Sequence, residues 1–202
     1  MTIFYTADLH LRHRRSPFYD KQGWDTAMLG EYPFTSSEER DNAIIERWNS
    51  VVGGNDTVYI LGDFCYAKRD EAIQLLACLH GKKHIVRGNH DRAWLGECVG
   101  IKGLNLRSVS DTAIVSDHSQ KLVLFHYPMF AWADQHKGSF HIYGHVHATK
   151  EEELYRKAGK LLAENDIPEF RAMNAGTMLW DYMPVTFEQM RFVYGFGLGR
   201  FD

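Results

Sequence analysis

The chain has 202 residues, 45% of them hydrophobic, and a formal net charge of −3, which favours one globular domain with a sizeable core. The small negative charge argues against a protein that coats long nucleic acid through a broad basic face, and no apolar run approaches the length of a membrane span. The 3 cysteines are odd in number and not spaced as a zinc knuckle, so we expect reduced thiols. Because Met1 leads almost at once into the first predicted strand, without a signal segment, we expect a complete, cytoplasmic chain.

Strand-like and helix-like runs alternate along the chain, which indicates a layered α/β fold. The strand-like runs are at 3–6, 58–61, 85–87, 112–115, 121–125 and 140–143. The first clear helix follows Ser36, which has the spacing of a capping box with Glu39. Its apolar face is predicted to hold Ile44, Trp48, Val51 and Val52. A second helix is predicted over about 70–80, with Gly81 as its C-terminal stop.

Two stretches resemble additions to this core within a single domain spanning 1–202. Residues 12–33 carry Arg12, Arg14 and Arg15 and have no clean period, so we predict a loop that borders the site. Residues 150–168 are predicted to form a helical insertion, whose amphipathic stripe would be Leu154, Tyr155, Ala158, Leu161 and Leu162. This helix could roof a cleft, form a dimer contact or pack on the outside of the domain.

Polar side chains stand where the strand-like runs end. The set is Asp8, His10, Asp63, Asn89, His90, His126, His145 and His147. Strand ends of a layered α/β protein face a common edge, so residues distant in sequence can meet in one cleft. Imidazole nitrogens combined with carboxylate and amide oxygens suit Mn, Fe, Zn, Co or Ni. No cysteine joins the set, which argues against a closed structural zinc site.

A pair of such ions has a specific chemical use. Two ions about 3.5–4 Å apart stabilise both the attacking and the leaving oxygen of an in-line displacement, and they lower the pKa of a shared water toward about 7. An aspartate can bridge two ions through its two oxygens, whereas a neutral amide donates only its carbonyl oxygen. The residue types therefore favour hydrolysis of phosphate esters.

The ordered motifs resemble those of the calcineurin-like metallophosphoesterases. They are Asp8-x-His10, Gly62-Asp63, Gly88-Asn89-His90-Asp91, His126 and Gly144-His145-Val146-His147. The resemblance extends over residues 1 to about 190 and is closer to a small bacterial and phage-type subgroup. The subgroup features are Trp48-Asn49-Ser50-Val51-Val52, Arg87-Gly88-Asn89-His90-Asp91-Arg92, His126-Tyr127-Pro128, Asn174-x-Gly176 and Trp180-x-Tyr182-x-Pro184-Val185.

The resemblance implies a four-layer α/β/β/α sandwich of the metallo-dependent phosphatase type. It implies one ion held by Asp8, His10, Asp63 and His147, and a second held by Asp63, Asn89, His126 and His145. Asp63 would then bridge the ions, which we expect to be manganese first, with Fe, Zn, Ni or Co as alternatives. His90 would bind a phosphate oxygen and protonate the leaving group, with Asp91 orienting it. The implied reaction is attack on phosphorus by a metal-bridging hydroxide.

Other polar and aromatic residues leave two interpretations open. Arg12 and Arg92 are candidates for substrate contact through bidentate hydrogen bonds. The alternative for Arg12 is a solvated charged loop, and for Arg92 a structural ion pair. His13 follows the first motif, but the intervening Leu11-Arg12 differs from the subgroup's aromatic-glycine pair. We interpret Cys65 as a core residue, and we favour packing over base stacking for the aromatic side chains of Trp132, Trp180 and Tyr182.

The predicted function is a dinuclear-metal-dependent phosphoesterase acting on a small phosphorylated substrate, with phosphodiesters or small nucleotides preferred to phosphoproteins. One alternative is a nuclease that acts on nucleic-acid ends, which would bind oligonucleotides in a salt-sensitive way. A second is a non-catalytic, metal-bound scaffold, which would be expected to lose ligands or the acid. All seven ligand positions and His90 are intact in this chain, which favours an enzyme. Extended nucleic-acid binding and membrane binding are not expected.

Overall fold

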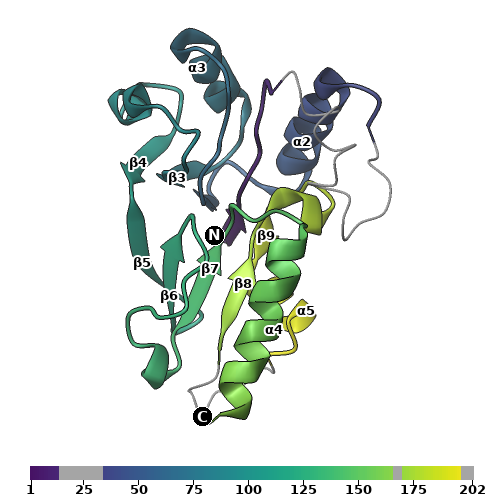
Figure 1. Ribbon diagram of the computed structural model, residues 1–202. Coiled ribbons are helices and arrows are strands. Elements are labelled where there is room, and N and C mark those ends of the chain that lie inside the picture. The colour runs from purple at the N-terminus through teal and green to yellow at the C-terminus, as the bar shows by residue number, and fades with distance from the viewer. Residues whose placement is uncertain (14–33, 166–169, 197–202) are drawn as a thin grey trace.

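A computed structural model describes residues 1–13, 34–165 and 170–196 (Figure 1). The 5-stranded sheet has the order β4-β3-β2-β1-β9, and the 4-stranded sheet has the order β5-β6-β7-β8. The first sheet consists of β1 (Ile3–Thr6), β2 (Thr57–Ile60), β3 (Lys82–Val86), β4 (Leu106–Ser110) and β9 (Val185–Thr186). The second consists of β5 (Thr112–Asp117), β6 (Gln120–Phe125), β7 (Phe140–Tyr143) and β8 (Ala172–Asn174).

Most strands run parallel, so their C-terminal ends meet at one edge. In the first sheet β1, β2, β3 and β4 are parallel, and only β9 is antiparallel to its neighbour. In the second sheet β6, β7 and β8 are parallel, while β5 and β6 form an antiparallel pair. The predicted strands at 112–115 and 121–125 are this pair. The connections after β1, β2, β3, β6 and β7 therefore carry the polar motifs to a common edge of the sandwich.

Helices pack around the two sheets (Figure 1). They are α2 (Ser37–Val51), α3 (Arg69–Cys78), α4 (Lys150–Glu164) and α5 (Phe187–Val193), with 3-10 turns η1 (Ala93–Cys98), η2 (Gln135–Lys137) and η3 (Thr177–Trp180). One core cluster joins α2 and α3 to the first sheet, a second joins the two sheets and α5, and a third joins α4 to the second sheet. The four-layer α/β/β/α sandwich is confirmed. No described helix is long and apolar enough to cross a membrane.

The start of α2 differs in one contact from the predicted capping box. The Ser36 hydroxyl accepts the Glu39 backbone N–H at 3.1 Å, as predicted. The Glu39 carboxylate instead accepts the backbone N–H and the hydroxyl of Thr35, at 2.7 and 2.6 Å. On the buried face, Ile44, Trp48 and Val52 are at most 2% exposed. Val51 was predicted on this face, but it is 39% exposed because it is the last residue of the helix, where the chain turns away toward β2.

The helix α4 lies in the segment where the sequence predicts a helical insertion, and the remainder of that segment, 166–168, lies outside the described residues. The predicted apolar stripe is confirmed at Tyr155, which is 7% exposed, but it is wrong at Leu154 and Leu161, which are 63% and 60% exposed. Besides Tyr155, the inner face holds Glu152 and Gly159. Gly159 is inside because a Cβ there would lie 2.3 Å from Cδ1 of Phe170, which occupies the space of a side chain.

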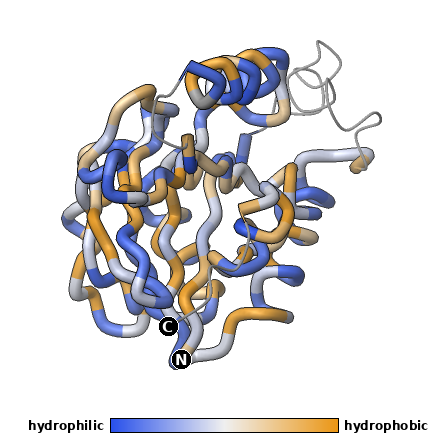
Figure 2. Tube along the Cα trace, turned by 90° about the horizontal axis from the view of Figure 1, so that it is seen from below, coloured by the Kyte–Doolittle hydropathy of each residue, from blue (hydrophilic) through white to orange (hydrophobic). Residues whose placement is uncertain are grey.

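The colouring by hydropathy in Figure 2 shows hydrophobic stretches along neighbouring strands in the interior. The aromatic residues considered for base stacking belong to this packed interior. Trp132 is 9% and Tyr182 is 4% exposed, and the Trp180 indole N–H donates to the Asn174 carbonyl at 2.9 Å. Cys65 is 5% exposed, and burial raises the pKa of its thiol to about 12. These side chains are packing residues, as the sequence favours.

Candidate metal centre

The polar motifs meet at the edge shared by the two sheets, where hydrogen bonds from backbone N–H groups connect the loops that carry them. The Asp8 N–H donates to the Gly62 carbonyl at 3.1 Å, and the His10 N–H donates to the Asp63 carbonyl at 2.9 Å. From the other sheet, the His145 N–H donates to both carboxylate oxygens of Asp8 at 3.0 Å. The loops after β1, β2 and β7 are thus fixed to one another before any ion is considered.

The ligand positions share an uncommon backbone conformation. Five of the predicted ligands have positive φ: Asp8 57°, His10 43°, Asp63 55°, His145 70° and His147 49°. This left-handed region is costly for residues other than glycine, and clusters of such residues mark functional sites. The chain bends sharply at each of these positions, which brings successive motif residues to the same cluster.

Glycines beside the ligands allow the loops to approach closely. A Cβ on Gly88 would lie 2.2 Å from Asp63 Oδ1, and a Cβ on Gly144 would lie 2.7 Å from Asp8 Oδ2. A Cβ on Gly62, which has a φ of +89°, would lie 2.3 Å from His126 Nδ1. The glycines of the three motifs are therefore required because a ligand side chain occupies the space that a Cβ would fill.

Replacing Gly88 with alanine should displace Asp63 and weaken metal binding. The added methyl group overlaps Asp63 Oδ1 at 2.2 Å and the Asp63 nitrogen at 2.6 Å, and such overpacking typically costs about 1–3 kcal/mol. Metal content after dialysis and the free energy of unfolding in urea both report the change. Gly54→Ala is the matched control, because its Cβ would have no neighbour within 4 Å. Equal metal content in Gly88→Ala and wild type would contradict the argument.

The first group of ligand atoms consists of Asp8, His10 and His147, which are all buried and can converge on one ion. The ring nitrogens His10 Nε2 and His147 Nε2 are 3.1 Å apart, and His147 Nε2 is 3.9 Å from Asp8 Oδ1. Burial, followed by the charges of His147 and His90, holds the pKa of His10 well below its ordinary value. His10 is therefore neutral, which is the form that binds a metal.

The second group is centred on Asp63 and His126. Asp63 Oδ2 lies 3.6 Å from His10 Nε2 and 3.6 Å from His126 Nε2, which places this carboxylate between the two groups. Asp8, Asp63 and His126 can also converge on one ion. Asn89 Oδ1 is 3.1 Å from His126 Nε2, and the rings of His126 and His145 are 5.1 Å apart. The structure thus brings all seven predicted ligands into one cluster.

The donor atoms of the second group fit a cation. His126 Nδ1 lies 2.8 Å from the Leu61 carbonyl, which can only accept, so this nitrogen carries the proton. The lone pair of His126 Nε2 then faces two oxygens, Asp63 Oδ2 and, in the amide orientation of the structure, Asn89 Oδ1. Lone pairs repel one another unless a cation lies between them. A carbonyl partner behind a histidine is also the usual way to fix the tautomer of a metal ligand.

Asp8 makes the metal-free protein sensitive to pH. Burial raises its pKa from 3.8 to about 6, although His147 and His126 oppose the shift. The folded state therefore binds more protons than the unfolded state between about pH 4 and 6, and stability falls as the pH rises through this window. Above this window the buried charge destabilises the metal-free fold, and a bound cation would offset that cost.

In EDTA at pH 7.5, Asp8→Asn should be more stable than wild type, because the variant has no buried charge. We expect its free energy of unfolding in urea to be higher by on the order of 1–3 kcal/mol. Near pH 4 the difference should vanish, since wild-type Asp8 is then protonated. With metal present the order should reverse, because only wild type gains the binding free energy. Asp111→Asn, whose side chain is 77% exposed, is the control. A variant no more stable than wild type at pH 7.5 would show that Asp8 is not a destabilising buried charge.

His90 lies beside this cluster and is more open than the buried ligand candidates Asp63 and His126. Its side chain is 39% exposed, against 2% for Asp63, and its Nε2 is 4.0 Å from Asp63 Oδ2. The His90 backbone N–H donates to Asp63 Oδ1 at 2.9 Å, and its ring is 5.6 Å from that of His10. The family resemblance predicts a proton donor at this position, and the structure places its partly exposed ring beside the buried Asp63 carboxylate.

The contacts of Asp91 give it a positioning role. Its carboxylate accepts the backbone N–H groups of Asp63, Phe64 and Gly88, each at 2.9 Å. These bonds tie the loop after β3 to the loop after β2. The described contacts of the Asp91 carboxylate are with these three N–H groups and not with the His90 ring, so the orientation of His90 by Asp91 stays a prediction.

The two predicted substrate-binding arginines differ. The Arg12 guanidinium is paired with Glu71 at 2.9 Å and Asp41 at 3.7 Å, so its charge is largely compensated. Arg92 is exposed at the start of η1, directly after the His90 motif, and no side-chain partner is found for it within the described ranges. Arg14 and Arg15 lie outside the described residues. The structure therefore favours Arg92 over Arg12 as a side chain available to a substrate.

Two partly exposed tyrosines beside the cluster were given no role of their own by the sequence analysis, although Tyr127 belongs to one of its motifs. Tyr66, 38% exposed, has its ring centroid 4.9 Å from that of His90 and is stacked on His13 at 4.0 Å. Tyr127, 37% exposed, lies 4.6 Å from His145 on the other side. Each follows a ligand motif closely in sequence, and that proximity was the available signal.

Comparison with known proteins agrees with this geometry. The family described as calcineurin-like phosphoesterase matches residues 1–149, and the chain belongs to that family. An uncharacterized protein of Methanocaldococcus jannaschii is 27% identical over 188 residues, covering 92% of this chain and 87% of that protein. The gene 66 protein of Mycobacterium phage L5 is 33% identical over 91 residues, covering 44% of this chain and 39% of the phage protein.

A solved structure supports the fold. The protein of unknown function from Aquifex aeolicus has a TM-score of 0.64 and 19% sequence identity, covering 95% of this chain and 98% of that one. At this identity the likeness concerns the fold alone. The family membership and the candidate ligand groups together define a metallophosphoesterase, a class of metal-binding hydrolase.

Proposed function

We propose that the protein hydrolyses phosphodiesters or small nucleotides with the help of two divalent transition-metal ions, manganese being the first candidate. When bound, such ions polarise the phosphate, stabilise the developing charge and make hydroxide available at neutral pH. Asp8, His10 and His147 would hold one ion, and Asn89, His126 and His145 the other. Asp63 would contribute to both, because its Oδ2 lies equally far from His10 Nε2 and His126 Nε2, at 3.6 Å.

The observation that carries this proposal is the position of His90 at the border of the buried predicted ligands, which are Asp8, His10, Asp63, His126 and His147. His126 and Asp63 are 0% and 2% exposed at their side chains, as expected of ligands, whereas His90 is 39% exposed next to them. An exposed imidazole at the border of a buried ligand cluster can hold a proton and reach a bound phosphate ester. His90 would donate that proton to the leaving oxygen, a contribution worth roughly 10²–10⁴-fold.

The surroundings of His90 support a small substrate. Tyr66 and Tyr127 are 38% and 37% exposed and lie beside His90 and His145, and partly exposed aromatic rings at these places suit an aromatic leaving group or a nucleobase. Arg92, exposed two residues after His90, would contact a phosphate oxygen. These groups favour a compact ester with an aromatic portion over an extended phosphoprotein.

An assay on metal-free protein reloaded with Mn, Fe, Zn, Ni or Mg tests the proposal. The substrates are a chromogenic diester and the matching monoester, then cyclic and linear nucleotides. We expect turnover with at least one transition metal, and faster turnover of the diester than of the monoester. Absence of turnover with every metal would refute the enzyme assignment. End-labelled oligonucleotides at two salt concentrations serve as the nuclease arm, because nuclease binding would weaken sharply with salt.

A further inference from the structure

The side chain of Glu152 is completely buried at the inner face of α4, with 0% exposure. Its Oε2 accepts the Tyr143 hydroxyl at 2.9 Å and the Asn174 amide at 3.0 Å. Its Oε1 accepts Arg156 Nε at 2.6 Å and is 3.4 Å from the Tyr194 hydroxyl. A carboxylate has only acceptors, and four donors from α4, β7, β8 and the end of α5 converge on it. The helix propensity of glutamate does not explain its burial here, whereas its four hydrogen-bond donors do.

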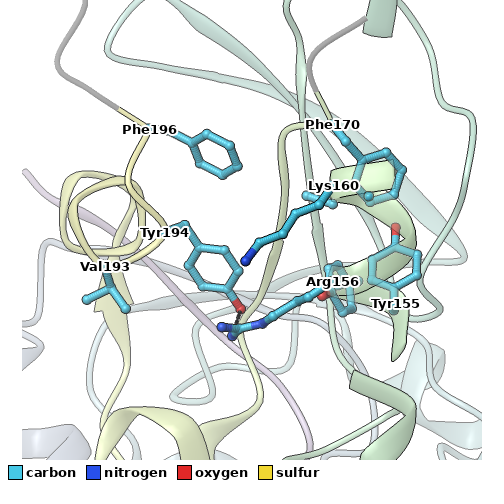
Figure 3. A pocket seen from close by; sticks show the side chains of 10 residues that line it. Tyr155, Arg156, Lys160, Phe170, Val193, Tyr194 and Phe196 are labelled. Carbon is cyan, nitrogen blue, oxygen red and sulfur yellow. Dashed lines mark hydrogen bonds between the residues drawn. The ribbon is translucent and has the colours of Figure 1, made fainter. Parts of the chain in front are cut away.

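Arg156 compensates the charge of Glu152 on the outer side. The Arg156 guanidinium also donates to the Tyr194 hydroxyl at 2.6 Å and lies 4.3 Å from the centre of that ring. Figure 3 shows this arginine and tyrosine side by side at the wall of a cavity of about 350 Å³ between α4 and the segment after α5. The other oxygen of Glu152, Oε2, accepts from Tyr143 and Asn174, and Asn174 lies on the side of the metal centre.

Asn174 connects Glu152 to a predicted metal ligand. Its Nδ2 donates both to Glu152 and, at 3.1 Å, to the backbone carbonyl of His147. Its Oδ1 accepts the Gly176 N–H at 2.7 Å, which fixes which way the amide faces. His147 has a φ of 49°, so its backbone is in a conformation that must be held by its surroundings. The Asn174 amide is positioned to hold it.

We propose that Glu152, acting through Asn174, is a positioning residue for the metal ligand His147, so that α4 is a part of the metal centre. This inference rests on the proposed metal centre but not on turnover. A buried carboxylate orients the amide, the amide fixes the His147 carbonyl, and the imidazole is held toward Asp8 and His10. Contacts behind a ligand typically contribute 10–100-fold in metal affinity.

Metal titration of three variants tests the proposal. Glu152→Gln introduces an N–H group among four donors, and Asn174→Asp replaces the donor with an acceptor that faces a carbonyl and a carboxylate. Each should weaken binding of one of two Mn or Co equivalents by roughly 10–100-fold and spare the other. Glu153→Gln is the matched control, because Glu153 is the next residue on α4, is exposed, and pairs only with Lys157 among its described contacts. It should bind both equivalents as wild type does.

The double variant Glu152→Gln/Asn174→Asp separates positioning from stability. The amide introduced on α4 can donate to the carboxylate introduced on β8, so the bond between these two elements is restored with its polarity reversed. The His147 carbonyl still lacks its donor. We expect the melting temperature to recover toward wild type while the affinity for the first ion stays low.

Wild-type affinity for both ions in the single variants, or full recovery of affinity in the double variant, would overturn the inference. An equal loss in Glu153→Gln would also overturn it, because the effect would then be one of surface charge. Metal affinity is measured without substrate. A wild-type protein that binds two ions but turns nothing over would refute the proposed function and leave this inference intact.

Discussion

Replacing Asp63 with asparagine should abolish turnover and reduce the bound metal from two ions to one or none. The Asp63 carboxylate lies between the two ligand groups, with Oδ2 at 3.6 Å from both His10 Nε2 and His126 Nε2. An amide has one carbonyl oxygen and no charge, so it cannot bridge two cations. Loss of Lewis-acid stabilisation is worth several kcal/mol, and each 1.36 kcal/mol is tenfold. We therefore expect a fall of roughly 10³-fold or more in kcat.

Metal analysis after gel filtration and steady-state assays on the same sample measure this effect. Asp63 Oδ1 also accepts the His90 N–H at 2.9 Å, and asparagine can keep that bond through its own oxygen. The loop should therefore stay folded, and far-ultraviolet circular dichroism should be unchanged. Asp111→Asn, an exposed carboxylate paired with Arg87, is the control and should retain both ions. Full activity in Asp63→Asn would show that Asp63 does not bridge.

Replacing His90 with alanine should slow turnover by roughly 10²–10⁴-fold while leaving metal content unchanged. The reason is that His90 is predicted to be a neighbour of the ligand cluster and not a member of it, with its Nε2 4.0 Å from Asp63 Oδ2 and its side chain 39% exposed. The loss should fall on kcat and depend on the leaving group. A nitrophenyl ester needs little protonation and should lose least, while an alkyl or nucleoside ester should lose most.

His136→Ala is the matched control for His90, because His136 is an exposed histidine of the η2 turn. It should have wild-type kinetics. Two results would reject the role of His90 as an acid. One is an equal rate loss for all leaving groups, and the other is loss of an ion from His90→Ala, which would make His90 a ligand.

The sequence predicts the reaction centre better than it predicts what surrounds it. The strand-end motifs are short, ordered and polar, and a parallel arrangement brings them to one edge whatever the details of packing. The layered fold and the convergence of Asp8, His10 and His147 follow from that rule. The division of the ligands between two ions and the proton transfer by His90 stay predictions, because they depend on the positions of metal ions and of a substrate.

The face of α4 could not be predicted, since its buried side is not its apolar side. Leu154 and Leu161 give the period of an amphipathic helix, but they point outward at 63% and 60% exposure. Burying Glu152 depends on four donors, three of which, Tyr143, Asn174 and Tyr194, come from separate parts of the chain. The hydrophobic periodicity of a helix does not indicate which donors from other elements will contact it. The placement of Tyr66 beside His90 was likewise hidden, because an exposed aromatic has no sequence pattern of its own.

The ligands of the candidate centre come from both sheets, and this has a consequence for folding kinetics. Asp8 and Asp63 follow β1 and β2, whereas His126 and His147 follow β6 and β7. Neither half of the sandwich contains a complete ligand group, since Asp8 requires His147 and Asp63 requires His126. We therefore expect metal uptake to be a late event in refolding, because it requires contacts between residues as distant in sequence as His10 and His147, 137 positions apart. The rate at which a refolding chain acquires its ions would then measure how fast the two sheets dock.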